Sequence, residues 1–208
     1  MININIDVYT LIRSEIKKLK KVGIETANLD CRILLSKSQD KDRVVYNHEN
    51  INISENEIKK FQSLVEQRLS GKPVSRIINK RNFWKDDFKL NEETLDPRPD
   101  SETLIEAVLE HYNNKLKSIK ILDLGSGSGC LGLSLLKEYE NSEVTFFDIS
   151  EKSLENVKIN ALNFGVLERA KFINLDWRVE EWDLNLIKIE NKIKFDFVIS
   201  NPPYIATD

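Results

Sequence analysis

The most constraining feature of this sequence is a glycine-rich segment that directly follows a short apolar run. The run Ile119–Leu122 has the length and composition of a buried strand, and the segment Asp123-Leu124-Gly125-Ser126-Gly127-Ser128-Gly129 follows it at once. Alternating glycines let the backbone turn sharply and approach a ligand closely at the start of a helix, where N–H groups lack partners. The pattern predicts a ligand-binding loop at the end of a strand.

Beyond Lys117, short apolar runs alternate with stretches of helical periodicity. These runs are Ile119–Leu122, Val144–Phe147, Phe172–Leu175 and Phe195–Ile199. Such alternation is typical of an α/β fold with a parallel, doubly wound sheet. Right-handed crossovers then predict the strand order third, second, first, fourth. We expect a Rossmann-like domain over residues 96–208.

Residues 1–71 have helical periodicity and no polar constellation of their own. We expect one amphipathic helix from Asp7 to Gly23, a second after Thr26, and a third from Ser54 to Gly71 that opens with a capping box. This small helical bundle suits substrate recognition better than catalysis. Residues 72–95, where apolar and polar positions alternate loosely after Pro73, are predicted to form a hairpin linker.

Composition excludes several classes of protein. Hydrophobic residues make up 40% and charged residues 31% of the chain, as in ordinary globular proteins. We find neither a secretion signal nor an apolar run of the roughly 18 residues that a membrane span needs, and we expect a cytoplasmic protein. Cys31 and Cys130 have no metal-binding or disulfide spacing, and we assign them, with His48 and His111, to structural positions.

Charge differs between the two parts of the chain. Residues 1–85 hold 17 Lys+Arg against 10 Asp+Glu, and the remaining residues hold 14 against 24. A basic first part on an acidic body is compatible with an acidic or nucleic-acid-bearing partner. A solvated, lysine-rich helix face explains the same counts equally well.

Two classes of ligand fit the glycine-rich segment. Gly127–Gly132 matches the dinucleotide pattern, and Asp148, 21 positions after Gly127, could bind the ribose of NAD. When the same segment is taken from Asp123, it resembles the first motif of S-adenosylmethionine-dependent methyltransferases. An acidic residue binds the ribose in that class too, so Asp148 does not discriminate, and it could also simply cap the next helix.

The end of the fourth strand favours methyl transfer. There the chain continues as Asn201-Pro202-Pro203-Tyr204, at the edge where open α/β sheets bind ligands. The prolines hold the Asn201 side-chain oxygen and the Pro202 carbonyl as fixed acceptors, and Tyr204 adds a flat face. This arrangement suits a planar NH₂ group, which needs orientation toward a methyl donor rather than a strong base. We predict Asn201, Pro202 and Tyr204 as catalytic residues.

The chain as a whole resembles the release-factor glutamine N(5)-methyltransferases, which methylate the glutamine of the Gly-Gly-Gln motif in peptide-chain release factors. The resemblance lies in the segments Gly71–Pro73, Phe83–Trp84, Pro97–Glu102, Asp123–Gly129, Asp176–Trp177 and Asn201–Tyr204. It implies a class I methyltransferase sheet with S-adenosylmethionine as cofactor and a release factor as protein substrate, with neither membrane nor nucleic acid as partner.

The resemblance also implies roles for single residues. Gly125, Ser126, Gly127, Ser128 and Gly129 would wrap the methionine part of the cofactor, Asp148 the ribose, and Asp176 with Trp177 the adenine. Asn201, Pro202, Pro203 and Tyr204 would bind the glutamine amide, and Arg98 and Glu102 would shape the same cleft. From the residues alone, a salt bridge or a helix start explains Arg98 and Glu102, and burial explains Trp177.

The sequence departs from the family pattern at four places. Asp96 and Arg178 stand where apolar residues are usual, and residues 178–194 form a longer segment than expected. The sequence also ends four residues after Tyr204, so we expect an incomplete sheet whose exposed fourth strand pairs with a missing C-terminal segment or another copy. Two alternatives stay open: methylation of exocyclic amino groups in DNA or RNA, and an inactive cofactor-binding fragment.

Overall fold

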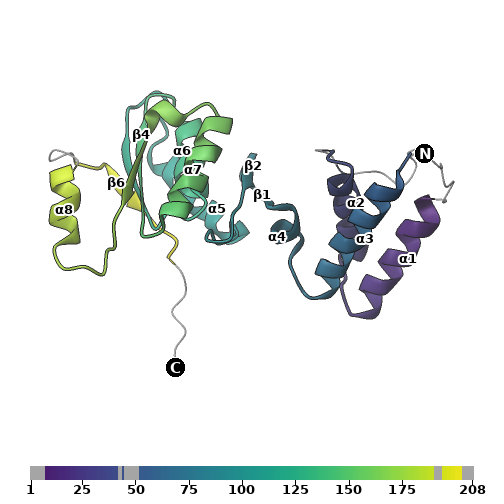
Figure 1. The fold of residues 1–208 in the computed structure, drawn as a ribbon. Helices are drawn as coiled ribbons and strands as arrows, with labels where there is room; N and C mark the ends of the chain where they lie inside the picture. The colour runs from purple at the N-terminus through teal and green to yellow at the C-terminus, as the bar shows by residue number, and fades with distance from the viewer. Residues whose placement is uncertain (1–7, 42–43, 45–51, 190–193, 203–208) are drawn as a thin grey trace. The chain divides into compact units, whose positions relative to one another are not determined.

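The chain divides into two compact units, with the boundary in the sequence between Asn79 and Lys80 (Figure 1). The computed structural model describes residues 8–41, 44, 52–189 and 194–202. Each unit has a hydrophobic core of its own. Among the described residues, no helix is both long and apolar enough to cross a membrane.

The first unit is a bundle of helices that bury apolar side chains against one another. Its core includes Leu19, Leu34, Phe61 and Val65, all fully buried. The predicted capping box opens the third helix, where Ser54 Oγ accepts a bond from the Glu57 N–H at 3.3 Å and the Glu57 carboxylate accepts one from the Ser54 N–H at 2.7 Å. The helices are α1 (Val8–Lys21), α2 (Ala27–Ser38), α3 (Glu55–Leu69) and α4 (Val74–Ile78).

Helix α4 corrects the prediction that the hairpin starts directly after Pro73. Pro73 is the N-cap of this short helix, because a proline near φ −61° already has the dihedral angle that a helix start accepts. Ile77 then packs into the core of the bundle, and Asn79 ends the helix in a left-handed conformation. The hairpin itself is present but shorter, with β1 (Lys80–Phe83) antiparallel to β2 (Asp86–Lys89).

The second unit is built on a parallel sheet of four strands. The strands are β3 (Lys120–Leu124), β4 (Glu143–Asp148), β5 (Ala170–Asn174) and β6 (Phe197–Ile199). Their order is β5-β4-β3-β6, which confirms the predicted order third, second, first, fourth. Because all four strands are parallel, their carboxyl ends lie along one edge of the sheet. The glycine-rich segment after β3 and the segment that begins at Asn201 after β6 both lie at this edge.

Two layers of side chains cover the sheet, as expected when residues alternate between its faces. On one face Ile121 and Phe146 pack against helices α5 (Glu102–His111), α6 (Cys130–Glu138) and α7 (Glu151–Asn163) and against the hairpin. On the other face Leu122 and Phe147 pack against Leu186 of α8 (Trp182–Ile189). Figure 1 shows α8 on the side of the sheet opposite to α6 and α7. Helix α8 thus accounts for part of the segment 178–194, which sequence alone did not place.

Two short 3-10 helices complete the described elements. They are η1 (Pro99–Ser101), directly before α5, and η2 (Leu167–Arg169), directly before β5. The segment of residues 97–101 therefore leads into α5, and its last residues already turn. Ser101 is the last residue of η1 and the N-cap of α5.

Candidate active site

The glycine-rich segment forms a loop that folds over the end of the neighbouring strand. Gly125, Gly127 and Gly129 have φ of 73°, 53° and 76°, a left-handed conformation that favours glycine. The N–H groups of Gly125 and Ser126 donate to the carbonyl of Phe147, at 2.8 and 3.1 Å. Helix α6 begins directly after Gly129, so the loop leads into the N-terminus of a helix, as predicted.

One buried polar atom of this loop has no partner. Within the part of the chain that the structure describes, the hydroxyl oxygen of Ser126 has no hydrogen-bond partner, although the residue is only 7% exposed. Buried polar groups are nearly always paired, and an unpaired one costs about 1–3 kcal/mol. Ser126 therefore offers an unused hydrogen-bonding group in the loop where the sequence predicts a ligand.

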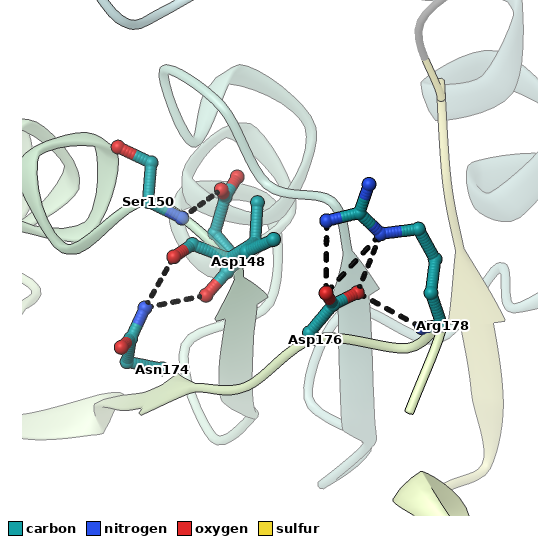
Figure 2. A network of polar contacts seen from close by, with 6 residues as sticks. Asp148, Ser150, Asn174, Asp176 and Arg178 are labelled. Carbon is teal, nitrogen blue, oxygen red and sulfur yellow. Dashed lines mark hydrogen bonds and ion pairs between the residues drawn. The ribbon is translucent and has the colours of Figure 1, made fainter. Parts of the chain in front are cut away.

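Asp148, the last residue of β4, connects this loop to the next helix. Its Oδ2 accepts a bond from the Gly127 N–H at 2.8 Å, and its Oδ1 accepts one from the Ser150 N–H at 2.9 Å, just before α7. Figure 2 shows Ser150 and Asn174 on either side of Asp148; the Asn174 side chain donates to the Asp148 carbonyl at 3.0 Å. A carboxylate has about four lone-pair positions, so Asp148 keeps acceptor capacity for a ligand.

Asp123 lies below the loop and is fully buried. Its Oδ2 accepts a bond from the Gly132 N–H at 2.9 Å, in the first turn of α6. Burial raises the pKa of Asp123 to about 7; the Gly132 bond opposes this rise and the negative charge of Asp148 adds to it. The carboxyl therefore joins β3 to α6.

The side chains of Asp176 and Trp177 lie in different surroundings: Trp177 contacts the glycine loop, and Asp176 binds Arg178. The indole of Trp177 lies against the loop, because a Cβ atom on Gly125 would come within 2.8 Å of its ring, and it stacks on Phe147 with centroids 6.4 Å apart. The Asp176 carboxylate instead accepts bonds from Nε and Nη2 of Arg178 at 2.9 and 2.8 Å (Figure 2). The hydrogen bonds from Arg178 hold the pKa of Asp176 below its ordinary value. Arg178, an unusual residue at its position, thus has a partner two residues away.

Asn201 follows β6 at the same edge of the sheet. Its side-chain Nδ2 donates to Ser101 Oγ at 2.8 Å, and the preceding Ser200 hydroxyl donates to the Leu124 carbonyl at the end of β3 at 2.6 Å. The two motifs therefore leave adjacent strands, since β3 pairs with β6 through Asp123 and Ile199. Pro202 is described and exposed. Pro203 and Tyr204 lie outside the described residues, as does His48.

The remaining predicted site residues lie in the segment before α5. Arg98 is exposed and precedes η1. The Glu102 carboxylate accepts a bond from the backbone N–H of Trp84 at 2.8 Å, so it fastens the hairpin to α5. Phe83 belongs to the hydrophobic core. Burial raises the pKa of both Cys31 and Cys130 to about 12, which keeps these thiols protonated and unreactive.

Two residues near these motifs were missed from the sequence. Ser101 contacts Asn201 from 100 positions away, and no local pattern indicates that contact. Asn160 is fully buried in α7, and its side-chain amide bonds to both backbone groups of Lys89 and to the Ser128 carbonyl at 3.2 Å. It therefore joins the hairpin to the glycine loop. A polar residue on the inner face of an amphipathic helix, repeated at Asn156, was the available signal.

Comparison with known proteins adds two domain matches. Residues 10–78 match the PrmC N-terminal domain, and residues 98–208 match the Methyltransferase small domain. The chain is 33% identical over 207 residues to the release factor glutamine methyltransferase of Aliivibrio fischeri, covering 97% of this chain and 67% of that protein.

In two further matches, this chain covers a smaller share of the matched protein's length. The bifunctional methyltransferase of Rickettsia prowazekii is 36% identical over 207 residues, which is 91% of this chain but 38% of that protein. A solved SAM-dependent methyltransferase from Geobacter sulfurreducens, in complex with S-adenosyl-L-homocysteine, is 29% identical over 38% of this chain and 30% of that one, with a TM-score of 0.32.

The two domain matches and the Aliivibrio fischeri relative confirm the family that the sequence motifs indicated and the methyltransferase class of its second domain. The match to the Methyltransferase small domain covers more than half of the chain and includes the glycine loop and Asn201. The Aliivibrio fischeri relative aligns with nearly the whole chain, including both compact units. The chain belongs to the release factor glutamine methyltransferase family.

Proposed function

We propose that this chain transfers a methyl group from S-adenosylmethionine to the glutamine side-chain amide of the Gly-Gly-Gln motif in peptide-chain release factors. The observation that carries the proposal is the placement of Asn201. It leaves β6 directly beside the strand that carries the glycine loop, and adjacent strands lie about 4.8 Å apart. A ligand on the loop and an amide at Asn201 would therefore be neighbours.

The residues of the loop fit S-adenosylmethionine, which when bound supplies an electrophilic methyl group on a positively charged sulfur. The loop has three glycines in left-handed conformations, of which Gly127 has open space beside its Cα, and among the described residues the buried hydroxyl of Ser126 has no partner. Asp148 retains acceptor capacity for ribose hydroxyls, and Trp177 supplies an aromatic face against Gly125. We propose that Gly125 to Gly129, Asp148 and Trp177 hold the cofactor. Asp176, already bonded to Arg178, would contribute through its backbone.

The contribution of Asn201 is to orient a poor nucleophile. Its Nδ2 is bonded to Ser101, so its Oδ1 is the atom left to accept an N–H from the substrate amide. The Pro202 carbonyl would accept the second N–H. Two acceptors that draw the N–H bonds out of the amide plane restore lone-pair character to the nitrogen, and orientation then supplies much of the rate without a strong base. After transfer, the surplus proton on the amide nitrogen would pass to solvent water.

The first unit is proposed to recognise the release factor. It matches the PrmC N-terminal domain, and the first 85 residues carry an excess of basic side chains. Pro203 and Tyr204, with Arg98, are proposed to complete the amide site. The chain spans 38% of the Rickettsia prowazekii relative and 67% of the Aliivibrio fischeri one, so the activity is proposed for this chain and tested on it directly.

The test is methyl transfer by the full chain from radiolabelled S-adenosylmethionine. Release factor, the same factor with its Gly-Gly-Gln glutamine changed to alanine, duplex DNA and RNA are offered separately. We expect label on the unchanged factor alone. The Asn201→Ala variant should lose turnover by roughly 100-fold, the size typical of one preorganised polar contact, while its affinity for S-adenosylhomocysteine is unchanged.

The matched control is Asn113→Ala, which removes an exposed asparagine two residues after the end of α5 and should leave turnover unchanged. Label on nucleic acid, or on the factor that lacks the glutamine, would contradict the proposed substrate. Equal losses of turnover and of cofactor affinity in Asn201→Ala would indicate damage to the fold instead.

A further inference from the structure

Ser101 occupies a helix-capping position without capping the helix. It is the N-cap of α5, where a serine side chain ordinarily accepts a hydrogen bond from an N–H of the first turn. The structure has no such bond, and the backbone of Ser101 is helical, at φ −73° and ψ −12°. The hydroxyl is therefore available for another partner.

The preceding 3-10 helix explains why the cap is not needed. In η1 the N–H of Ser101 donates to the Arg98 carbonyl at 3.0 Å, and the N–H of Glu102 is bonded to the carbonyls of Pro99 and Asp100. Helix α5 thus continues from an existing turn. Its first N–H groups are partly satisfied by the backbone, and the serine side chain can bond elsewhere at little cost to the helix.

That other partner is Asn201. The Ser101 hydroxyl, in a residue only 7% exposed, accepts a bond from Asn201 Nδ2 at 2.8 Å. The backbone of Asn201 is constrained from both sides, because the Ser200 hydroxyl is bonded to the Leu124 carbonyl and because Pro202 restricts the residue before it. Among the described residues, no group donates to Asn201 Oδ1.

We propose that Ser101 is a positioning residue that holds the Asn201 amide with its nitrogen toward the serine and its oxygen toward the substrate, an inference that rests on the proposed function. Without the hydroxyl, the amide can rotate, and the substrate N–H meets either an amide nitrogen or an unfixed oxygen. Loss of the Ser101 hydroxyl therefore lowers kcat. The cofactor lies on the glycine loop, so its affinity is not affected.

The test compares Ser101→Ala with Ser101→Thr, which keeps the hydroxyl, and with Thr103→Ala. The last is a matched control, because the Thr103 hydroxyl bonds to the Asp100 carbonyl at 2.7 Å in the same turn but does not contact Asn201. We expect kcat for release-factor methylation to fall about 3- to 10-fold in Ser101→Ala, the worth of one neutral hydrogen bond. Ser101→Thr and Thr103→Ala should stay within about 2-fold of the wild type, a range set by the same magnitude. The affinity for S-adenosylhomocysteine should not change in any variant.

A second measurement needs no methyl transfer. In protein labelled with ¹⁵N at asparagine, the side-chain NH₂ signal of Asn201, assigned by its loss in Asn201→Ala, should shift in Ser101→Ala and not in Thr103→Ala. If the Asn201 signal shifts in Ser101→Ala but the wild-type chain methylates none of the substrates, the Ser101–Asn201 contact is supported and the proposed function is contradicted. An unmoved signal with unchanged kcat would overturn the inference, as would a loss of cofactor affinity equal to the loss of kcat.

Discussion

The carboxylate of Glu138 accepts a hydrogen bond from the indole Nε1 of Trp84 across 2.9 Å, although 54 positions separate the two residues. Lys85 and Lys115 donate to the same carboxylate, whose side chain is only 6% exposed. Trp84 has an unusual positive φ of 56°, and its backbone N–H donates to Glu102. Two carboxylates therefore hold the turn of the hairpin against helices α5 and α6, beside the residues that lead to Ser101.

Replacement of Glu138 by glutamine should destabilise the second unit at neutral pH. Burial alone would raise the pKa of Glu138, but the bonds from Lys115, Lys85 and Trp84 outweigh it and hold the pKa at about 2. A carboxylate with a lowered pKa stabilises the fold above its unfolded value of 4.5, and this contribution disappears as the pH falls toward 2. We expect Glu138→Gln to lower the free energy of unfolding by about 2–3 kcal/mol at pH 7.

Urea unfolding followed by tryptophan fluorescence measures this difference at pH 7 and at several values below pH 4.5, where it should shrink. Glu110→Gln, which changes an exposed residue of α5, is the control and should have little effect. A difference that stayed constant down to acid pH would show that the charge of Glu138 is not what holds the hairpin.

Replacement of Asp123 by asparagine should stabilise the fold at neutral and higher pH, the opposite of the effect expected for Glu138→Gln. The pKa of Asp123 is raised from 3.8 to about 7, chiefly by burial, so the folded state favours the protonated carboxyl. Wild-type stability should fall as the pH rises from about 4 to about 7 and level off above that. An asparagine side-chain oxygen can still accept the Gly132 N–H. We expect Asp123→Asn to be more stable than the wild type by roughly 2–4 kcal/mol at pH 8 and to lose that advantage near pH 4. Parallel stability curves for the two proteins would contradict this account.

Sequence patterns were sufficient to predict most helices of the first unit and the strand order of the second. Apolar spacing and the Ser54–Glu57 capping box located the helices of the bundle, and the fixed hand of parallel crossovers predicted the order of the four strands. Helix α4 was missed because residues 72–95 were expected to form a hairpin linker, whereas Pro73 is the N-cap directly before the first helical residue, Val74.

The candidate site was predictable in its motifs but not in its contacts. The glycine loop and Asp148 lie together as the spacing indicated, because strand ends share one edge of the sheet. Glu102 was expected to shape the substrate cleft, and no pattern indicated that its carboxylate accepts a bond from the Trp84 N–H. The Ser101–Asn201 bond joins residues 100 positions apart. No periodicity encodes which side chains meet across such a distance, since their meeting depends on the packing of α5 against the sheet.

Replacement of Gly132 by alanine should disrupt the start of α6. The added Cβ would lie 2.5 Å from Cε1 of the buried Phe146 and 2.9 Å from Asp123 Oδ2, so the ring and the carboxyl must both move. We expect Gly132→Ala to lower the free energy of unfolding by about 1–3 kcal/mol despite the better helix propensity of alanine. Ser134→Ala is the control in the same helix. The buried Ser134 hydroxyl has no partner among the residues that the structure describes, so its removal should be neutral or stabilising. Equal effects of the two substitutions would refute the close contact.

Replacement of Asp148 by alanine should weaken binding of S-adenosylhomocysteine by roughly 10- to 100-fold, the worth of charge-assisted hydrogen bonds to hydroxyl groups. The carboxylate also accepts the Gly127 and Ser150 N–H groups, so part of that loss will come from a less ordered loop. Asp148→Asn separates the two contributions, because an amide keeps one acceptor oxygen for the backbone but removes the charge. Isothermal titration calorimetry and thermal unfolding are measured on both variants and on Asp183→Ala, an exposed control in α8. If Asp148 binds the ligand directly, Asp148→Asn keeps more of the thermal stability than Asp148→Ala does but still loses affinity; if its affinity equals that of the wild type, Asp148 only supports the loop.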